Sequence, residues 1–428
     1  MFRADNFSIL SRFVGFAIFF YLATLAIVPD VYGYAPALML LAALGYWRTS
    51  EIVKSLDRRD RLFVFGYLAY GLVFVVLVVL HKDDLSGLDR PSRFVAAAII
   101  LTMLLRISVS ARLVFTGAAL GGICSGLFAG HEVWVSDVSR VASFDNAIYF
   151  GNGALILALI SLGGGLSELQ KRPSHVGFIV LYSSGMIGGI AGLLLSGTRG
   201  GWLAVPVITL VGLWTYRRTL ARRPKMLAVS LIVIIALGVA AVNMKVVSDR
   251  GGAAVSEVQL YFSGDRINSS VGLRLEMWKA GAILFANHPV VGVGEKRFHT
   301  ELEQLVDSGL VGSGILTFRH LHNQFLDHAA KGGILAVFAL LLVFGIPMAL
   351  FWRYLKSTDP EIKACAFVGV TFTLSFVVFC LTQGMFSRNI GVMMYVIVPL
   401  FLWALIRQVE GKAVQSQDSD LPVTRRLD

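Results

Sequence analysis

The sequence predicts an all-α polytopic membrane protein with about twelve transmembrane helices and one large, partly helical loop between the ninth and the tenth. Hydrophobic residues make up 56% of the 428, and the mean hydropathy is +0.71. Only 15% are charged, against about 25% in ordinary soluble domains. Apolar runs of membrane-spanning length recur along most of the chain, and in lipid such continuous runs form helices. This composition excludes a soluble globular enzyme.

The apolar runs give the order of the predicted spans, of which the second, fourth and eighth are short. The twelve runs lie at 12–28, 33–47, 62–80, 92–106, 112–130, 147–166, 175–196, 200–216, 225–245, 333–352, 364–383 and 389–407. Cys124, Cys365 and Cys380 fall within apolar stretches and form no C-x-x-C motif, so we expect them to be packing residues.

The positions of Lys and Arg predict which ends of the spans face the cytoplasm. The loops at 48–61 and 217–225 carry five basic residues each, and they fall on the same side. That side, which includes both termini, collects 23 basic residues, whereas the short loops of the other side collect six. Basic short loops stay in the cytoplasm. The net charge of +11 therefore reflects topology, and we expect no nucleic-acid partner.

This topology divides the chain into four parts. Residues 1–244 carry spans one to nine, 245–332 form the long outer loop, 333–407 carry spans ten to twelve, and 408–428 form a cytoplasmic tail that we expect to be disordered. The outer loop holds nine basic residues, nine acidic residues and five of the eight histidines.

The outer loop also contains the pattern of an amphipathic helix. In "SSVGLRLEMWKAGAILFANHP", Ser270 can cap a helix, and His288-Pro289 ends it. One face is apolar at helical spacing: Leu273, Met277, Ala280 and Leu284. The glycine-containing turn "VVGVGEKRF" follows. We therefore expect an ordered platform or lid at the membrane surface.

Cationic residues stand where the even-numbered spans begin at the outer face. Arg93 opens span four, Arg199 opens span eight, His322 and Asn323 precede span ten, Arg388 opens span twelve, and Arg274 lies in the loop above. A single arginine there is ordinarily a residue that reaches to the membrane surface. Together, at helix N-termini that favour anions, these residues predict a pocket for a phosphorylated lipid.

Three stretches in this order resemble the O-antigen ligase and polymerase superfamily. They are "LSGTRGGWLAV", "GLRLEMWKAGAILFANHPVVGVGEKRF" and "HLHNQFLDHAAKGGILAV". The second has the R-x-x-x-W helix ending in P-x-x-G-x-G, and the third has H-N-x-x-L leading into a span. The earlier segments "LDRPSRFVAAA" and "DNAIYFGNGAL" also look like those of the ligases, so the resemblance runs from about Leu88 to Val337.

The resemblance implies a glycosyltransferase in the bacterial inner membrane with its active site on the periplasmic side. The donor would be an undecaprenyl-diphosphate-linked O-antigen and the acceptor lipid A–core oligosaccharide, with no cofactor and no metal. Family roles fall on Arg199 and Arg274 as diphosphate-binding residues and on His322 as the essential histidine. We add Arg93 and Arg388 to the donor-binding set. The supporting residues are Asn323, Gln324 and Trp278.

This chemistry suits the side chains. A neutral histidine can take the proton of an acceptor hydroxyl, and arginine can bind the leaving diphosphate bidentately. Direct displacement would invert an α-linked donor. His320, His322 and His328 could instead suggest a metal, but no Asp-x-Asp or Glu-x-x-His motif stands nearby. We therefore expect no catalytic role for His320 or His328.

Three other functions remain open from the sequence. An O-antigen polymerase would use the same donor, and a protein O-oligosaccharyltransferase of the same superfamily usually has a longer C-terminal outer region. A transporter with twelve spans would be expected to carry charge near the membrane midplane and internal repeats. Here the polar residues cluster at one face, and no repeat is evident.

Overall fold

The structure, a computed structural model, describes residues 4–46, 56–143, 146–222 and 269–419, with a few positions between 257 and 263. Within these ranges every regular element is a helix. The bundle consists of α1 (Ala4–Thr24), α2 (Val31–Tyr46), α4 (Arg58–His81), α5 (Asp89–Leu104), α6 (Ala111–Trp134), α7 (Ala147–Gln170), α8 (Val176–Leu195), α9 (Arg199–Arg222), α14 (Gln324–Trp352), α15 (Pro360–Thr382) and α16 (Asn389–Ser419). Beside it lie α12 (Ser270–Asn287) and α13 (Glu295–Asp307).

The predicted all-α membrane fold is confirmed. Each predicted span coincides with a helix except the ninth, 225–245, which lies outside the described residues. Within the described part of the chain, seven helices are long and apolar enough to cross a membrane. The second and fourth predicted spans are indeed short, with 16 residues each, whereas the eighth is a helix of 24 residues.

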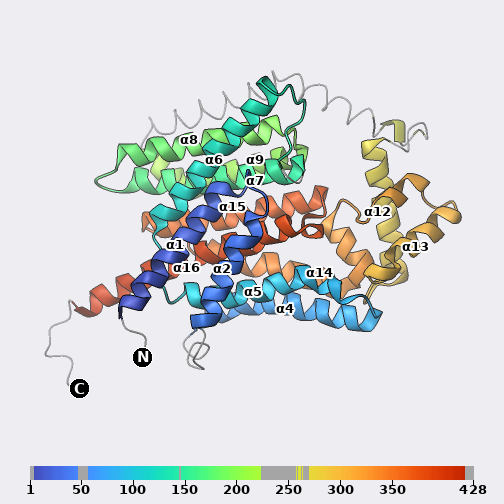
Figure 1. Ribbon diagram of the computed structural model, residues 1–428, viewed down its shortest axis with the longest axis horizontal. Coiled ribbons are helices and arrows are strands. Elements are labelled where there is room, and N and C mark those ends of the chain that lie inside the picture. The colour runs from blue at the N-terminus through green and yellow to red at the C-terminus, as the bar shows by residue number, and fades with distance from the viewer. Residues whose placement is uncertain are drawn as a thin grey trace.

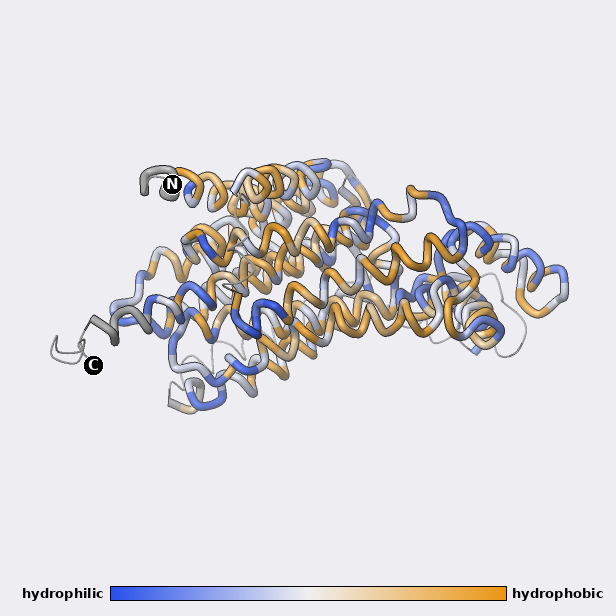
Figure 2. The backbone as a smooth tube through the Cα atoms, turned by 90° about the horizontal axis from the view of Figure 1, so that it is seen from below, coloured by the Kyte–Doolittle hydropathy of each residue, from blue (hydrophilic) through white to orange (hydrophobic). Residues whose placement is uncertain are grey.

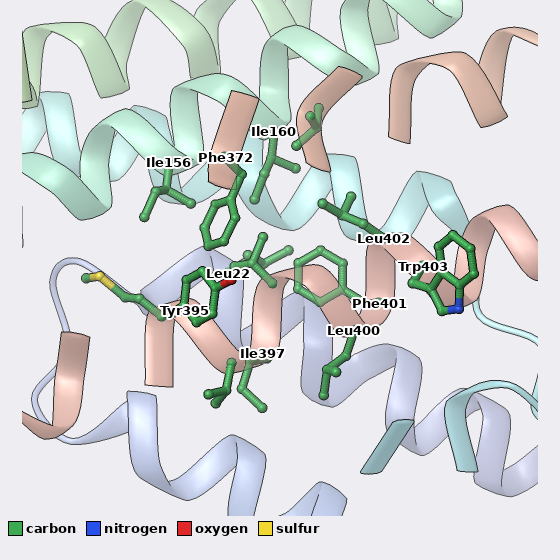
Figure 3. Close-up of a cluster of buried hydrophobic side chains, with 14 of the residues drawn as sticks. Leu22, Ile156, Ile160, Phe372, Tyr395, Ile397, Leu400, Phe401, Leu402 and Trp403 are labelled. Atoms are coloured by element: carbon green, nitrogen blue, oxygen red, sulfur yellow. The ribbon is translucent and has the colours of Figure 1, made fainter. Parts of the chain in front are cut away.

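The centre of the bundle is built on α16. In its most apolar window 94% of the residues are buried, against 28% in the peripheral α8. Figure 3 shows apolar side chains from other helices converging on α16. The residues labelled there are Leu22 of α1, Ile156 and Ile160 of α7, Phe372 of α15, and Tyr395, Ile397, Leu400, Phe401, Leu402 and Trp403 of α16. This dry core fixes the positions of the helices that carry the polar ends.

Helices α6 and α8 pack through small residues. A Cβ added at Gly122 would come within 2.2 Å of the Gly185 carbonyl oxygen, and one at Gly126 within 2.7 Å of Gly188 Cα. Without side chains at these positions the two backbones touch, which is the usual way for helices to associate in lipid.

The two ends of the bundle differ in what they carry. Figure 1 shows the start of α1 and the end of α16 at one end, while α12 and α13 project from the other. Figure 2 shows a largely hydrophobic middle with hydrophilic stretches toward both ends. We call the end with α12 and α13 the platform end. The start of α1 and the end of α16 therefore lie at the end opposite to the platform.

The platform has a small core of its own. Met277, Ala280 and Leu284 of α12 are buried against Phe298 and Leu302 of α13. The predicted apolar face is thus correct, and the helix ends at Asn287 as expected. Its first-turn cap is Ser269 rather than Ser270, since the Ser269 side chain accepts a hydrogen bond from the Gly272 amide.

The glycine-containing turn after α12 docks the platform on α14. Gly292 and Gly333 both adopt positive φ, and a Cβ at either would lie within 2.4 Å of backbone on the other segment. This closeness allows the Val293 amide to donate to the Ala330 carbonyl at 2.9 Å and the Ile334 amide to the Pro289 carbonyl at 2.8 Å. The glycines are therefore required for backbone contact, which holds the platform rigidly on the bundle.

Two helices extend beyond their predicted boundaries. Helix α14 begins at Gln324 instead of 333, because the Asn323 side chain caps it and Gly333 only kinks it. Helix α16 continues to Ser419, past the predicted start of a disordered tail at 408. The side-chain nitrogen of Gln408 donates a hydrogen bond to the Ile107 carbonyl at 2.7 Å, which holds the start of the segment beyond 407 on the bundle.

Candidate functional site

His322 lies on a short, strained loop at the platform end of α14. Its φ of 49° falls in the left-handed region, which a residue with a β-carbon rarely adopts. The loop is held on both sides of it: the Asp327 carboxylate accepts from the Leu321 amide at 3.1 Å, and Asn323 caps α14. Strain of this kind persists only where the surroundings impose it and is common at functional sites.

The side chain of His322 is oriented by Gln383, which follows α15. Its Nδ1 is hydrogen-bonded to the Gln383 Oε1 atom. Because an amide oxygen can only accept, Nδ1 carries the proton, and the lone pair of the neutral ring is on Nε2. Gln383 is buried, whereas His322 is half-buried. The structure thus presents a fixed tautomer with a basic nitrogen.

The electrostatic surroundings keep His322 neutral. Burial, with a further contribution from the neighbouring His320, lowers its pKa to about 4, although the bond to Gln383 acts in the opposite direction. Arg274 lowers the pKa further. At neutral pH the imidazole is therefore uncharged, as a proton acceptor must be.

His320 is part of this site, although we predicted no catalytic role for it from the sequence. Its ring centroid lies 4.3 Å from that of His322, and its Nδ1 accepts from the His322 amide at 3.3 Å. Burial lowers the pKa of His320, and so do the nearby cations Arg388 and Arg90. Arg388 thus lies within electrostatic reach of His320, and so does Arg90, which the sequence analysis did not single out. The donor-binding role of Arg388 stays a prediction.

Arg274 and Arg199 are brought together from distant parts of the chain. Burial lowers the pKa of Arg274, and the like charges of Arg199 and Arg140 lower it further. Within the described residues neither Arg199 nor Arg274 forms a salt bridge. The carboxylate of Glu257 acts on the pKa of Arg274 in the opposite direction and accepts a hydrogen bond from the Val271 amide at 3.0 Å. Arg274 is thus repelled by two other guanidinium groups, and a bound anion would relieve this repulsion.

The turn that carries Arg199 is built against α7. The Thr198 hydroxyl donates to the Ala147 carbonyl at 2.8 Å and accepts from Ser196 at 2.8 Å. Gly200, the residue after Arg199, has no room for a side chain, because a Cβ there would lie 2.3 Å from the Thr382 hydroxyl. Arg199, by contrast, is exposed at the first position of α9, where an anion also meets free helix amides.

Three other predicted residues have structural partners. Arg93 contacts both carboxylate oxygens of Asp89 at 3.1 Å. Asn323 is the cap of α14. The Gln324 side-chain oxygen accepts from the Phe386 amide at 2.6 Å, and its nitrogen donates to His328 at 2.9 Å, so both ends of this side chain have partners inside the protein. Its supporting role stays a prediction.

His328 and Trp278 differ in how their polar atoms are used. The second ring nitrogen of His328 bonds the Tyr70 hydroxyl at 2.9 Å, so both its nitrogens are occupied inside the protein. Trp278 packs against the platform core, and its indole N–H is buried without a partner among the described residues. Its supporting role stays a prediction.

Sequence reasoning missed Gln383, Arg140 and His320 at this site. Gln383 follows a long apolar run, and the unusual polarity of "TQG" at the end of a span was the available signal. Among the described residues, no three His, Cys, Asp or Glu side chains are grouped so that they could hold a metal ion. Metal independence itself stays a prediction.

Comparison with known proteins agrees with this geometry. A family model described as O-antigen ligase matches residues 184–341, which contain Arg199, Arg274 and His322. Residues 184–341 form an O-antigen ligase family domain. The histidine-bearing loop, the platform and the turn before α9 all belong to this domain, whereas Gln383 and Arg388 come from the part of the chain beyond it.

Two relatives extend the comparison. An O-antigen ligase of Escherichia coli (strain K12) is 24% identical over 229 residues, which cover 51% of this chain and 52% of that protein. An uncharacterised protein of Haemophilus influenzae (strain Rd) is 25% identical over 381 residues, 87% of this chain and 93% of that protein. The similarity to a ligase is thus confined to about half of each chain, whereas the second likeness covers nearly all of both.

Proposed function

We propose that this protein transfers a glycan from a polyprenyl diphosphate carrier to a second lipid-anchored glycan, with His322 as the general base. The O-antigen ligase family domain supports a membrane glycosyl-transfer role in O-antigen and lipopolysaccharide synthesis. The donor would be undecaprenyl-diphosphate-linked O-antigen, and the acceptor lipid A–core oligosaccharide at the periplasmic face of the inner membrane. The observation that carries the proposal is a neutral His322 near Arg274, with Arg199 close to Arg274 and neither arginine in a salt bridge among the described residues.

The proposed reaction is one displacement. The Nε2 atom of His322 takes the proton of the acceptor hydroxyl while that oxygen attacks C1 of the donor sugar. The bond from C1 to the diphosphate oxygen breaks, and its electron pair stays on the diphosphate. Arg199 and Arg274 meet the charge that develops there, which is the usual function of arginine in phosphate binding. Attack from the side opposite to the leaving group inverts the configuration at C1.

Donor binding would also strengthen the base. A base with a pKa of about 4 is weak, and its conjugate acid is disfavoured by Arg274 and by burial. A bound diphosphate offsets the charge of Arg274 and adds negative charge near the imidazole, so it raises the pKa of His322. The histidine would then accept a proton readily only when the donor is in place. This order limits proton uptake in the absence of substrate.

Two measurements test the proposal. Purified protein in lipid vesicles is incubated with lipid-linked O-antigen and lipid A–core, and lipopolysaccharide is resolved on gels. A ladder of long glycans on core is the expected result. Joining of two lipid-linked glycans without transfer to core would identify a polymerase instead. Movement of the donor across the vesicle with no new glycosidic bond would identify a transporter and overturn the proposal.

A further inference from the structure

A basic cavity lies at the end of the bundle opposite to the platform. It has a volume of about 180 Å³, whereas a single water needs only about 10–15 Å³ on the same kind of measure. The cavity is formed where the end of α9 meets the end of α14 and the start of α15. Its lining residues are Trp214, Thr215, Arg217, Arg218, Leu355, Lys356 and Lys363. The space is large enough for a group bigger than several waters.

Four of the lining residues are cations, and none forms a salt bridge within the part of the chain that the structure describes. Arg218 and Lys363 lie close enough to repel each other electrostatically. Lys363 stands over the ring of Tyr216 at 4.8 Å, and Arg217 over Trp214 at 5.2 Å. The aromatic rings support the cations without neutralising them. The net positive charge of the cavity is therefore left for a ligand.

Thr215 supplies a second, independent indication of a ligand. It is 8% exposed and lines the cavity, and its hydroxyl has no hydrogen-bond partner among the described residues. Threonines in apolar helices usually donate to the carbonyl four residues earlier. Thr209 on the same helix does so, at 2.9 Å from the Val205 oxygen. The hydroxyl of Thr215 is thus a buried donor that needs an acceptor from outside.

Topology alone does not account for this arrangement. Basic residues collect on the cytoplasmic side of any membrane protein, and Arg61 and Arg353 at the same end are ordinary examples, exposed and outside the cavity. The rule predicts neither a cavity nor a buried hydroxyl without a partner. The stacked rings of Trp214 and Trp352, with centroids 5.3 Å apart, also mark the level of the lipid headgroups, where tryptophan concentrates.

We propose that the basic cavity binds a phosphate group, with the headgroup of an anionic phospholipid as its source. Arginine and lysine would bind the phosphate oxygens, the Thr215 hydroxyl would donate to one of them, and the acyl chains would lie against the outer faces of α9 and α14. Basic pockets between membrane helices are a known setting for anionic headgroups. The position at the ends of lipid-facing helices favours a lipid over a soluble phosphate.

The test is a lipid titration of the full-length protein in mild detergent. Thermal unfolding is followed as phosphatidylglycerol, phosphatidylcholine or glycerol 3-phosphate is added, because a ligand that binds only the folded state raises the midpoint. Phosphatidylglycerol is expected to stabilise the protein, and the other two are not, since phosphatidylcholine carries a compensating positive charge and glycerol 3-phosphate has no acyl chains. Equal stabilisation by glycerol 3-phosphate would show a site for soluble phosphate, and equal stabilisation by phosphatidylcholine would show that the negative charge of the headgroup has no role. Either result overturns the lipid proposal.

Matched variants locate the effect. Arg217→Gln with Arg218→Gln should weaken the response to phosphatidylglycerol about tenfold or more, since bonds to charged groups are lost. Arg61→Gln with Arg353→Gln removes the same charge at the same end and should leave the response unchanged. Thr215→Val keeps the shape and removes only the hydroxyl, so it should weaken binding less. If both double variants weaken the response equally, binding reflects general charge and the cavity has no role.

Discussion

Two groups of arginines in this bundle are used in opposite ways. At the end opposite to the platform, Arg407 contacts the carboxylates of Asp57 at 2.7 Å and Asp60 at 3.1 Å, and it also pairs with Glu410. Asp60 accepts a further hydrogen bond from Trp403 at 2.8 Å. At the platform end, Arg199 and Arg274 form no salt bridge among the described residues and face other cations. The charge of Arg407 is matched by carboxylates of the protein, whereas the charges of Arg199 and Arg274 are not matched in this way among the described residues.

The difference shows how to separate structural charge from functional charge. Arg407 and Trp403 of α16 bond Asp60 of α4, so these polar groups join the two helices and are already occupied. Like charges held together cost stability, so their arrangement points to a ligand of opposite charge. Arg93 lies between the two cases, because one of its nitrogens contacts Asp89 while its buried Nε has no partner among the described residues, and its donor-binding role stays a prediction. Five predictions test this comparison.

The largest expected effect is on His322. His322→Ala should reduce transfer by about 10²–10⁴-fold, because a general base typically contributes that much. Initial rates with lipid-linked donor and lipid A–core are the measurement. His299→Ala is the matched control on the platform, where that side chain is half exposed and only 3.7 Å from Glu303. Substantial turnover by His322→Ala with native acceptor would exclude it as the base.

Arg199→Ala and Arg274→Ala should each reduce transfer by about 10²–10³-fold, the usual effect of removing a group that stabilises developing charge. Arginine-to-lysine variants should recover only part of the activity, since lysine lacks the planar fork. Arg297→Ala is the control, because that side chain is exposed and 3.9 Å from Glu301. Unchanged donor affinity and rate in both alanine variants would remove the diphosphate role.

Arg407→Ala should destabilise the protein without changing its chemistry. It leaves the buried Asp60 carboxylate without its arginine, which costs about 3 kcal/mol in comparable buried pairs. Thermal unfolding in detergent should show a lower midpoint, while the transfer rate per folded molecule stays at the wild-type value. A loss of specific activity with unchanged stability would show that Arg407 has a functional role and not a structural one.

Gln383→Leu should reduce transfer by about three- to tenfold, since one neutral hydrogen bond contributes roughly 0.5–1.5 kcal/mol. Gln383→Glu should move the acidic limb of the pH–rate profile to higher pH, because a carboxylate at Nδ1 raises the pKa of His322. A purely packing role for Gln383 would lower activity in both variants and leave the limb where it is in the wild type.

The smallest effect is expected from pH on the wild type. The pKa of His322, about 4, lies below its ordinary value, so the ring is already neutral at pH 6. The value of kcat/KM for the donor should therefore be constant from about pH 6 to 8 and fall only at acidic pH. The acidic fall of kcat should begin at a higher pH than that of kcat/KM, because bound diphosphate raises the pKa of His322. Activity that declines as pH rises through 6–7 would indicate a cationic histidine instead.

The sequence by itself determined the helices and the platform, and it predicted three site residues. Hydrophobic run length and helical periodicity are local properties, so they place α4, α14 or α12 without knowledge of their neighbours. Arg199 and His322 stood out because they precede predicted spans, where helix N-termini favour anions, and Arg274 because it lies in the outer loop. Their individual roles came from the resemblance to the ligase and polymerase superfamily. The structure brings these three residues together.

Only the tertiary structure decided which polar groups are already occupied. The hydrogen bond between His322 and Gln383 joins residues 61 positions apart, and the one between the Gln324 side chain and the Phe386 amide joins residues 62 positions apart. Likewise, the start of α14 was placed too late, because Gly333 resembles a helix boundary in sequence but is a kink that admits the backbone of Val290. Hydrogen bonds of this range depend on how helices pack, which no local pattern specifies.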